Sequence, residues 1–292
     1  MAKALVLGGA TGLLGRPLAA ALKKDGWDVE TLGRENGDLL DPDFLRSRLE
    51  AVNPQIVFNT VAWTQVDDAE DHPEEAMRVN RGLPNSLARI LKGMPDVWLG
   101  QISTDFVFSG YHLEPFTEES VPNSPTVYGK TKQAGEEAVL SLLPDRACVI
   151  RTAWLFGPGR KNFVDTILSA CRKRDSVSVV DDQHGSPTYT LDVANWCVAL
   201  ANKRATGIWH AVNSGQASWC ELASEAIQLM SGLCRVQPIS SEEWPQKARR
   251  PHNSSLDNSK LAKFLGKKPR CWAQALRDYL FSEYEIQGRG GK

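Results

Sequence analysis

A strand, a glycine loop and a helix follow one another at the start of the chain, and this order constrains the fold more than any other feature. Residues 4–7 are an unbroken apolar run, which is typical of a strand buried on both faces. Gly9, Gly12 and Gly15 come next, and leucines then recur at helical spacing over residues 13–24. Glycines at such a turn let the backbone approach a pyrophosphate, and the helix N-terminus offers it free N–H groups. The pattern favours a dinucleotide-binding unit over a plain strand–helix turn, although its G-x-x-G-x-x-G spacing differs from the more usual G-x-G-x-x-G.

Strands and helices go on alternating along the chain. We expect further strands over residues 27–32, 55–61, 96–102, 147–151 and 177–180, and helices over 41–52, 73–91, 128–142 and 162–174. This alternation predicts an α/β fold, a Rossmann-type doubly wound parallel sheet with helices on both faces. The stretch 105–126 has three prolines and no periodicity, so it is predicted to be a loop, and loops of that length are usually functional.

The pattern changes beyond residue 181, where shorter elements are separated by clusters of glycine, serine and proline. We therefore predict an NAD(P)-binding Rossmann domain over residues 1–180 and a smaller, C-terminal substrate-binding lobe over 181–292. A segment over about 190–212, with one helix and one short strand, is expected to return to the Rossmann domain.

Composition argues against several classes of protein. The 292 residues carry a net charge of −1, so no basic field favours nucleic acid or an anionic membrane, and the opening apolar run is too short to span a bilayer. The six cysteines are scattered without a C-x-x-C pair or a Cys/His cluster, which argues against a zinc site. We expect reduced cysteines that pack as small core residues, and a cytoplasmic location.

Tyr128 and Lys132 lie four residues apart on an expected helix and therefore on the same face. An ammonium beside a phenol favours the ionised phenol, so the pair could exchange a proton with a substrate oxygen near neutral pH. The alternative is an ordinary solvent-facing pair. Thr104 ends an expected parallel strand, which is where open α/β sheets bind their ligands.

Two charged residues follow the second strand, where the adenosine ribose of a dinucleotide is normally recognised. Arg34 could pair with a 2′-phosphate and favour NADPH, whereas Glu35 could accept from a 2′-hydroxyl and favour NADH. We expect NADPH, with NADH as the alternative.

Several stretches match the motifs of one known family. They cover residues 58–67, 103–108, 128–136, 151–157, 162–163, 180–188 and 249–257. With the glycine loop, they make the chain similar to the dTDP-4-dehydrorhamnose reductases, which belong to the extended short-chain dehydrogenase/reductase superfamily. The resemblance runs from residue 3 to about residue 280. The stretches around Trp154 and Arg249-Arg250-Pro251 are more specific to this branch than the glycine and Tyr/Lys motifs.

The resemblance implies a catalytic triad of Thr104, Tyr128 and Lys132. Tyr128 would donate a proton to the C4 oxygen of a ketosugar as hydride arrives from the nicotinamide, and Lys132 would hold the nicotinamide ribose and lower the pKa of the phenol. Thr104 would hydrogen-bond the substrate carbonyl or the phenol. The expected cofactor contacts, glycine loop included, are Gly9, Thr11, Gly12, Leu13, Leu14, Gly15, Arg34, Asp38, Leu39, Ala62, Trp63, Thr64, Tyr128 and Lys132.

The expected substrate contacts are Thr104, Asp105, Trp154, Arg249 and Arg250. Trp154 would form a wall for the sugar or the base, and the two arginines would face the nucleotide diphosphate. Each of these residues has a simpler alternative role. Trp154 could be a core tryptophan, Asp105 could cap the loop, and Arg249 and Arg250 could lie in a solvated basic loop.

The chain departs from the family pattern at several positions. Arg34 stands where a small or acidic residue is frequent, and Trp63 stands where tyrosine or histidine is common. Some family members are described with a magnesium-bridged dimer built on glutamates, but Gly15 and Asp192 offer no such pair. We therefore predict no metal requirement and leave a homodimer open.

Four functions compete at this point: a nucleotide-ketosugar reductase, an NAD-dependent epimerase or dehydratase, a non-catalytic regulatory subunit of the methionine adenosyltransferase type, and a redox-sensing or RNA-binding Rossmann protein. Related dehydratases place Asp-Glu after the strand-end threonine, but here Thr104 is followed by Asp105-Phe106, which favours reduction. The intact triad argues against the regulatory subunit, and the charge argues against RNA. We expect NADPH-dependent reduction of dTDP-4-dehydro-L-rhamnose to dTDP-L-rhamnose. The nucleotide and the stereochemistry of the sugar are not fixed by the sequence.

Overall fold

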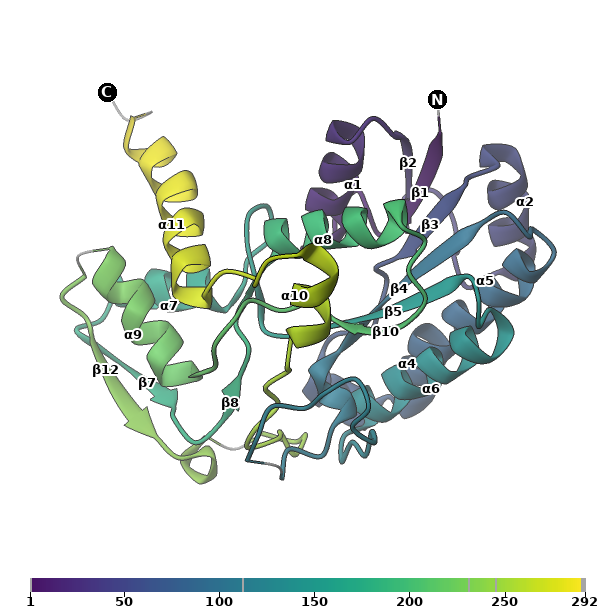
Figure 1. Ribbon diagram of the computed structural model, residues 1–292. Coiled ribbons are helices and arrows are strands. Elements are labelled where there is room, and N and C mark those ends of the chain that lie inside the picture. The colour runs from purple at the N-terminus through teal and green to yellow at the C-terminus, as the bar shows by residue number, and fades with distance from the viewer. Residues whose placement is uncertain (1, 112, 231, 245, 290–292) are drawn as a thin grey trace.

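A parallel sheet forms the centre of the larger part of the molecule (Figure 1). The computed structural model describes residues 2–111, 113–230, 232–244 and 246–289. Within these ranges the sheet has six strands in the order β10-β5-β4-β3-β1-β2, and every neighbouring pair is parallel. The strands are β1 (Lys3–Leu7), β2 (Asp28–Leu32), β3 (Ile56–Asn59), β4 (Trp98–Thr104), β5 (Ala147–Thr152) and β10 (Gly207–His210).

Helices cover both faces of this sheet because alternate strand residues point to opposite sides. Ala4 and Val6 join one apolar layer with α1 and α8, while Leu5 and Leu7 join the other layer with α2, α5 and α6. These helices are α1 (Gly15–Lys24), α2 (Pro42–Val52), α5 (Leu83–Lys92), α6 (Val127–Leu142) and α8 (Thr190–Asn202). The predicted doubly wound Rossmann fold is confirmed.

The carboxyl ends of the central strands lie at one edge of the sheet. Leu7, Asn59 and Gln101 are neighbours across β1, β3 and β4, and Thr104 is opposite Thr152 of β5. The loops that follow these four strands therefore meet, and they carry most of the residues expected to bind cofactor and substrate.

The long helix expected over residues 73–91 is interrupted, so that prediction is wrong in detail. The short helices α3 (Val66–Asp71) and α4 (Pro73–Met77) are followed by a π-helical turn, Arg78–Gly82, before α5 begins. Single π turns inside helices are frequently found at functional sites. The apolar spacing on either side could not reveal the turn, because it shifts the register by only one residue.

A second core lies beside the sheet and packs together elements from between residues 156 and 280. Its elements are α7 (Phe163–Cys171), β7 (Ser176–Val180), α9 (Trp219–Leu229), β12 (Arg235–Ile239) and the apolar start of α11 (Trp272–Arg289). The expectation that residues 177–180 extend the main sheet is wrong, because β7 pairs in parallel with β12. The segment with α8 and β10 does return to the main sheet, where β10 pairs with β5. An apolar run shows that a strand is buried but not which strand it pairs with.

Shorter elements connect the two cores. They are β6 (Leu155–Phe156), β8 (His184–Gly185), β9 (Thr188–Tyr189), β11 (Ala217–Ser218), α10 (Ser259–Leu265) and two 3₁₀ turns, Asp105–Val107 and Ser241–Glu243. In the ranges described above, no helix has the length and hydropathy of a membrane span.

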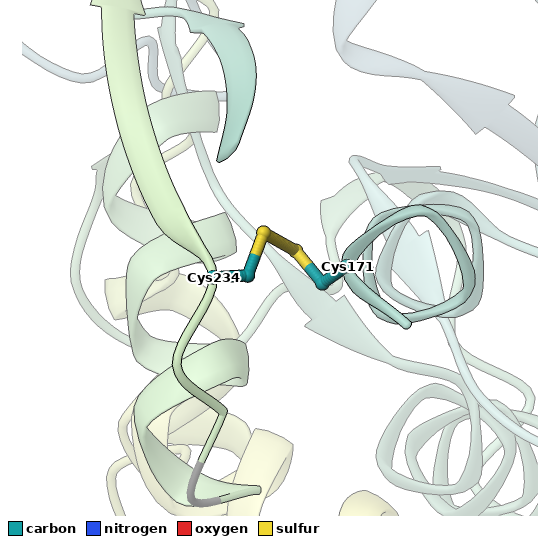
Figure 2. The surroundings of a disulfide bond; sticks show 2 residues. All are labelled: Cys171 and Cys234. Carbon is teal, nitrogen blue, oxygen red and sulfur yellow. A yellow bond between two sulfur atoms is a disulfide. The ribbon is translucent and has the colours of Figure 1, made fainter. Parts of the chain in front are cut away.

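Cys171 and Cys234 form a disulfide, which corrects the expectation that all cysteines are reduced (Figure 2). The bond joins the last residue of α7 to the segment just before β12, with 5.3 Å between the two Cα atoms. Sequence separation is 63 residues, so no spacing rule could identify the pair. Cys148 and Cys197 are free and buried in the main core, as expected.

Candidate active site

The glycine loop after β1 packs tightly under the start of α1. The Gly12 N–H donates to the Gly8 carbonyl at 3.0 Å, and a Cβ added to Gly15 would lie 2.2 Å from that same oxygen. Only glycine therefore fits at position 15, where the start of α1 packs closely on the end of β1, as in dinucleotide-binding loops. Of the other residues expected here, Thr11 is exposed, Leu13 is half-buried and Leu14 is part of the core.

The loop after β2 presents Arg34 to solvent, and Arg34 forms no salt bridge with any residue that the structure describes. Glu35 instead folds back over Gly33, since a Cβ on Gly33 would lie 2.4 Å from its carboxylate. The exposed Asp38 accepts from the Leu40 N–H at 2.9 Å. Leu39 is 6% exposed. Its side chain packs in the core beside α2 and does not point to solvent.

Asn80, in the π turn, fixes the loop after β3 and was missed by the sequence analysis. Its side chain accepts from the Trp63 N–H at 2.8 Å and donates to the Trp63 carbonyl at 3.2 Å. It also donates to the Thr131 hydroxyl at 3.0 Å, which ties this loop to α6. Ala62, Trp63 and Thr64 are thus held beside the Tyr128 helix. The sequence signal for this irregular turn was an asparagine within an expected helix. Asparagine side chains tend to hydrogen-bond nearby backbone groups and so disfavour a regular helix.

Thr104, Tyr128 and Lys132 meet at the end of β4. The Thr104 hydroxyl donates to Asp105 Oδ1 at 3.0 Å, and the Thr104 side chain also lowers the pKa of the Tyr128 phenol. Lys132 Nζ donates to the Ile102 carbonyl at 2.7 Å. Tyr128 is 9% exposed and Lys132 only 4%, so the alternative of a solvent-facing pair does not apply.

Burial dominates the protonation of these side chains. It raises the pKa of Tyr128 to about 12, with the Asp105 charge adding to the rise and the Thr104 hydrogen bond opposing it. Burial also lowers the pKa of Lys132 to about 8, against the Glu136 charge, which raises it. The expected lowering of the Tyr128 pKa by Lys132 is not found, because the ammonium is directed at the Ile102 carbonyl. Tyr128 therefore stays protonated at neutral pH, as a proton donor must.

Asp105 is a buried carboxyl group beside the triad. It is 2% exposed, and burial raises its pKa to about 6 although the side chains of Ser254 and Thr104 lower it. Its Oδ2 has no hydrogen-bond partner among the described groups.

No set of three or more His, Cys, Asp or Glu side chains within the described ranges is placed to hold a metal ion.

Trp154 follows β5 at the same edge of the sheet and belongs to an aromatic cluster. Its ring stacks on Trp219 with 3.5 Å between centroids and 3° between planes, and Phe163 lies 4.6 Å from Trp219. Trp154 has a φ of 45°, a strained value that recurs at functional sites. A Cβ on Gly185 would come within 2.3 Å of the indole, so Gly185 makes room for it. Trp219 was not predicted as a site residue, because nothing in the local sequence shows that it contacts Trp154.

The two arginines of the C-terminal lobe are already engaged. Arg250 makes a bidentate pair with Asp67 of α3, at 3.0 and 2.7 Å. The Arg249 guanidinium lies over the Tyr111 ring, 5.3 Å from its centroid. Arg250 therefore fastens the lobe to α3, and Arg249 is the freer cation.

A Rossmann sheet with a glycine loop, a strand-end threonine and a buried Tyr-x-x-x-Lys helix defines the extended class of short-chain dehydrogenases/reductases. The family model described as RmlD substrate binding domain matches residues 2–284. The chain belongs to this family, that of the dTDP-4-dehydrorhamnose reductases, which confirms the resemblance.

Individual relatives support the assignment. A dTDP-4-dehydrorhamnose reductase from Streptomyces griseus is 42% identical, with 97% of this chain and 94% of the relative covered. A dTDP-4-keto-6-deoxy-D-glucose reductase from Streptomyces niveus is 36% identical over 92% of this chain and 93% of its own. The solved structure of a dTDP-4-dehydrorhamnose reductase from Bacillus anthracis in complex with NADP superposes with a TM-score of 0.92, at 28% identity, covering 97% of this chain and 100% of that one.

Proposed function

We propose that this protein reduces the C4 keto group of dTDP-4-dehydro-L-rhamnose to give dTDP-L-rhamnose, with NADPH as the hydride donor. The observation that carries the proposal is the group of buried Thr104, Tyr128 and Lys132 side chains at the carboxyl edge of a parallel sheet whose first strand leads into a glycine loop. A neutral phenol whose pKa is about 12 can give its proton to an alkoxide. Thr104 would orient the carbonyl, and Lys132 would hold the nicotinamide ribose.

The residues around the loop fit NADPH. The glycine loop lets the start of α1 pack closely on the end of β1, as it does in dinucleotide-binding sites, and the exposed Arg34 is available to a 2′-phosphate. When bound, the cofactor would supply the hydride. We assign the rest of the cofactor site to Gly9, Thr11, Gly12, Leu13, Leu14, Asp38, Leu39, Ala62, Trp63 and Thr64.

The substrate side of the site is assigned to Asp105 and Trp154 at the edge of the main sheet, and to Arg249 in a C-terminal lobe that we place over residues 181–292 with α7 and β7 joined to it. Arg250 is assigned to the same side through its bond to Asp67. We also propose a cytoplasmic location, and a homodimer as the assembly to test.

The decisive assay follows NADPH absorbance with dTDP-4-dehydro-L-rhamnose and with dTDP-4-keto-6-deoxy-D-glucose as separate substrates. Turnover of the first alone supports the proposal. Turnover of the second alone would instead place this chain with the relative from Streptomyces niveus. Tightly bound NAD with no net NADPH consumption would favour an epimerase.

Arg34→Ala is expected to lower the preference for NADPH over NADH by about 10- to 100-fold, because a hydrogen bond to a charged group contributes about 1.5–3 kcal/mol. The ratio of kcat/KM for the two cofactors measures it. Glu35→Gln is the matched control and should leave the NADPH value unchanged. An unaltered ratio in Arg34→Ala would show that another residue reads the phosphate.

Trp219→Ala is expected to raise KM for the nucleotide sugar up to about tenfold with little change in kcat, because a stacked aromatic pair contributes about 0.5–1.5 kcal/mol. Without the stack, the Trp154 indole loses one of the surfaces that hold it. Trp219→Phe should recover most of the loss. Trp209→Ala removes a half-buried indole of the main sheet that packs on Phe264, and should leave KM unchanged. Equal effects of the two alanine variants would contradict a role of Trp219 in substrate binding.

A further inference from the structure

Helix α6 buries three functional groups in a row, at every fourth residue. Tyr128, Lys132 and Glu136 are 9%, 4% and 3% exposed, so all three face the sheet. The first two belong to the proposed active site. Glu136 lies one turn further along, and a carboxylate buried this deeply is stable as an anion only when it is paired and hydrogen-bonded.

Two strand residues supply those partners. Arg151 of β5 donates through Nε at 3.0 Å and through Nη2 at 2.7 Å to the Glu136 carboxylate, and the Ser103 hydroxyl donates to Oε1. Ser103 and Arg151 are neighbours across β4 and β5. Ser103 also precedes Thr104, so the carboxylate joins α6 to the strand that carries the third member of the triad.

The ion pair is itself enclosed. Arg151 is 1% exposed, and its guanidinium lies 5.0 Å above the Phe108 ring, whose other neighbours include His210. The titratable and charged groups around Lys132 on these elements are Tyr128 and Glu136 on α6, Asp105 after β4, and Arg151 on β5. The pKa of Asp105 is raised to about 6, so this carboxyl group is mostly ionised at neutral pH. Glu136 is the charge that stabilises the ammonium, while Arg151 is not among the groups that act on it.

We propose that Glu136 is a positioning residue for the reaction, which keeps Lys132 as the ammonium ion that would hold the nicotinamide ribose, and that Arg151 and Ser103 fix the carboxylate in place. The proposal rests on the proposed function. It explains why a carboxylate is kept in a region where burial disfavours the charged form of the lysine. It also gives Arg151 a role at the active site without contact with substrate or cofactor.

The test must separate this electrostatic role from a merely structural one. Glu136→Gln alone leaves Arg151 as a buried charge without a counter-ion and can fail to fold. The double variant Glu136→Gln/Arg151→Met removes both charges while keeping side chains of similar size. Glu137→Gln, an exposed neighbour on the same helix, is the matched control.

The readout is the pH dependence of kcat for ketosugar reduction, together with the pH dependence of NADPH affinity, which needs no ketosugar. Activity requires charged Lys132, so it is lost as pH rises through the pKa of that lysine. Removal of the Glu136 charge lowers this pKa, so both profiles of the double variant should fall at a pH lower by about one unit, as expected for loss of a nearby opposite charge. The control should match wild type.

A folded double variant whose two profiles coincide with those of wild type would overturn the proposal. If wild type consumes no NADPH with any nucleotide 4-ketosugar, the proposed function fails instead, and the shift in NADPH affinity still decides the role of Glu136.

Discussion

Tyr128→Phe is expected to lower kcat for ketosugar reduction by about 10²- to 10⁴-fold, the usual contribution of a positioned general acid. Phenylalanine keeps the ring contact with Phe106, where the centroids are 5.6 Å apart, and loses only the hydroxyl that would donate the proton. NADPH affinity should therefore stay close to that of wild type. The measurements are NADPH consumption under saturating substrate and a fluorescence titration of NADPH binding.

Tyr279→Phe is the control for this experiment, because it removes a buried hydroxyl that donates to Asp165 in the second core, at 2.6 Å. It should leave kcat unchanged. A Tyr128→Phe enzyme that turns over at close to the wild-type rate would exclude Tyr128 as the proton donor and would direct attention to Asp105, the other buried acid beside Thr104.

Reduction of the Cys171–Cys234 bond is expected to lower the free energy of unfolding by about 4 kcal/mol, the loop-entropy value for a closed loop of this size. The bond spans 63 residues and joins the end of α7 to the segment just before β12, so its loss frees this long loop in the unfolded chain. Denaturant unfolding with and without reductant measures the difference, and Cys171→Ser should reproduce the reduced value.

Cys220→Ser is the matched control, since Cys220 lies in the same lobe and is free. It should leave the response to reductant intact. A wild-type protein whose stability does not respond to reductant would show that the two sulfurs are not bonded in solution. The cytoplasm keeps most thiols reduced, so the proposed location predicts the less stable, reduced form in the cell.

Most of the Rossmann fold was predictable because its signals are local. An apolar run, a glycine turn and a leucine-spaced helix each lie within about ten consecutive residues, and parallel strands joined by helices allow few arrangements. The edge where Thr104 and Tyr128 meet follows from the same rule, since the carboxyl ends of parallel strands share one side of the sheet.

The partners of these residues were not predictable. In the sequence, Asn80 is only a polar residue within an expected helix. In the structure, its side chain hydrogen-bonds both Trp63 and Thr131. Strand 177–180 was identified as buried but assigned to the wrong sheet, because its partner β12 begins 55 residues after β7 ends. Cys171 and Cys234 carried no signal of their pairing at all.

The glycine loop, the strand–helix order and the Tyr128/Lys132 spacing were thus determined by the sequence alone, since each depends on the local geometry of a turn or a helix. Only the tertiary structure decided the protonation of the pair. Burial keeps Tyr128 neutral and lowers the pKa of Lys132, whereas the Glu136 charge raises the pKa of Lys132. Burial and long-range electrostatic interactions depend on how the whole chain packs, so the residue spacing within α6 cannot predict them.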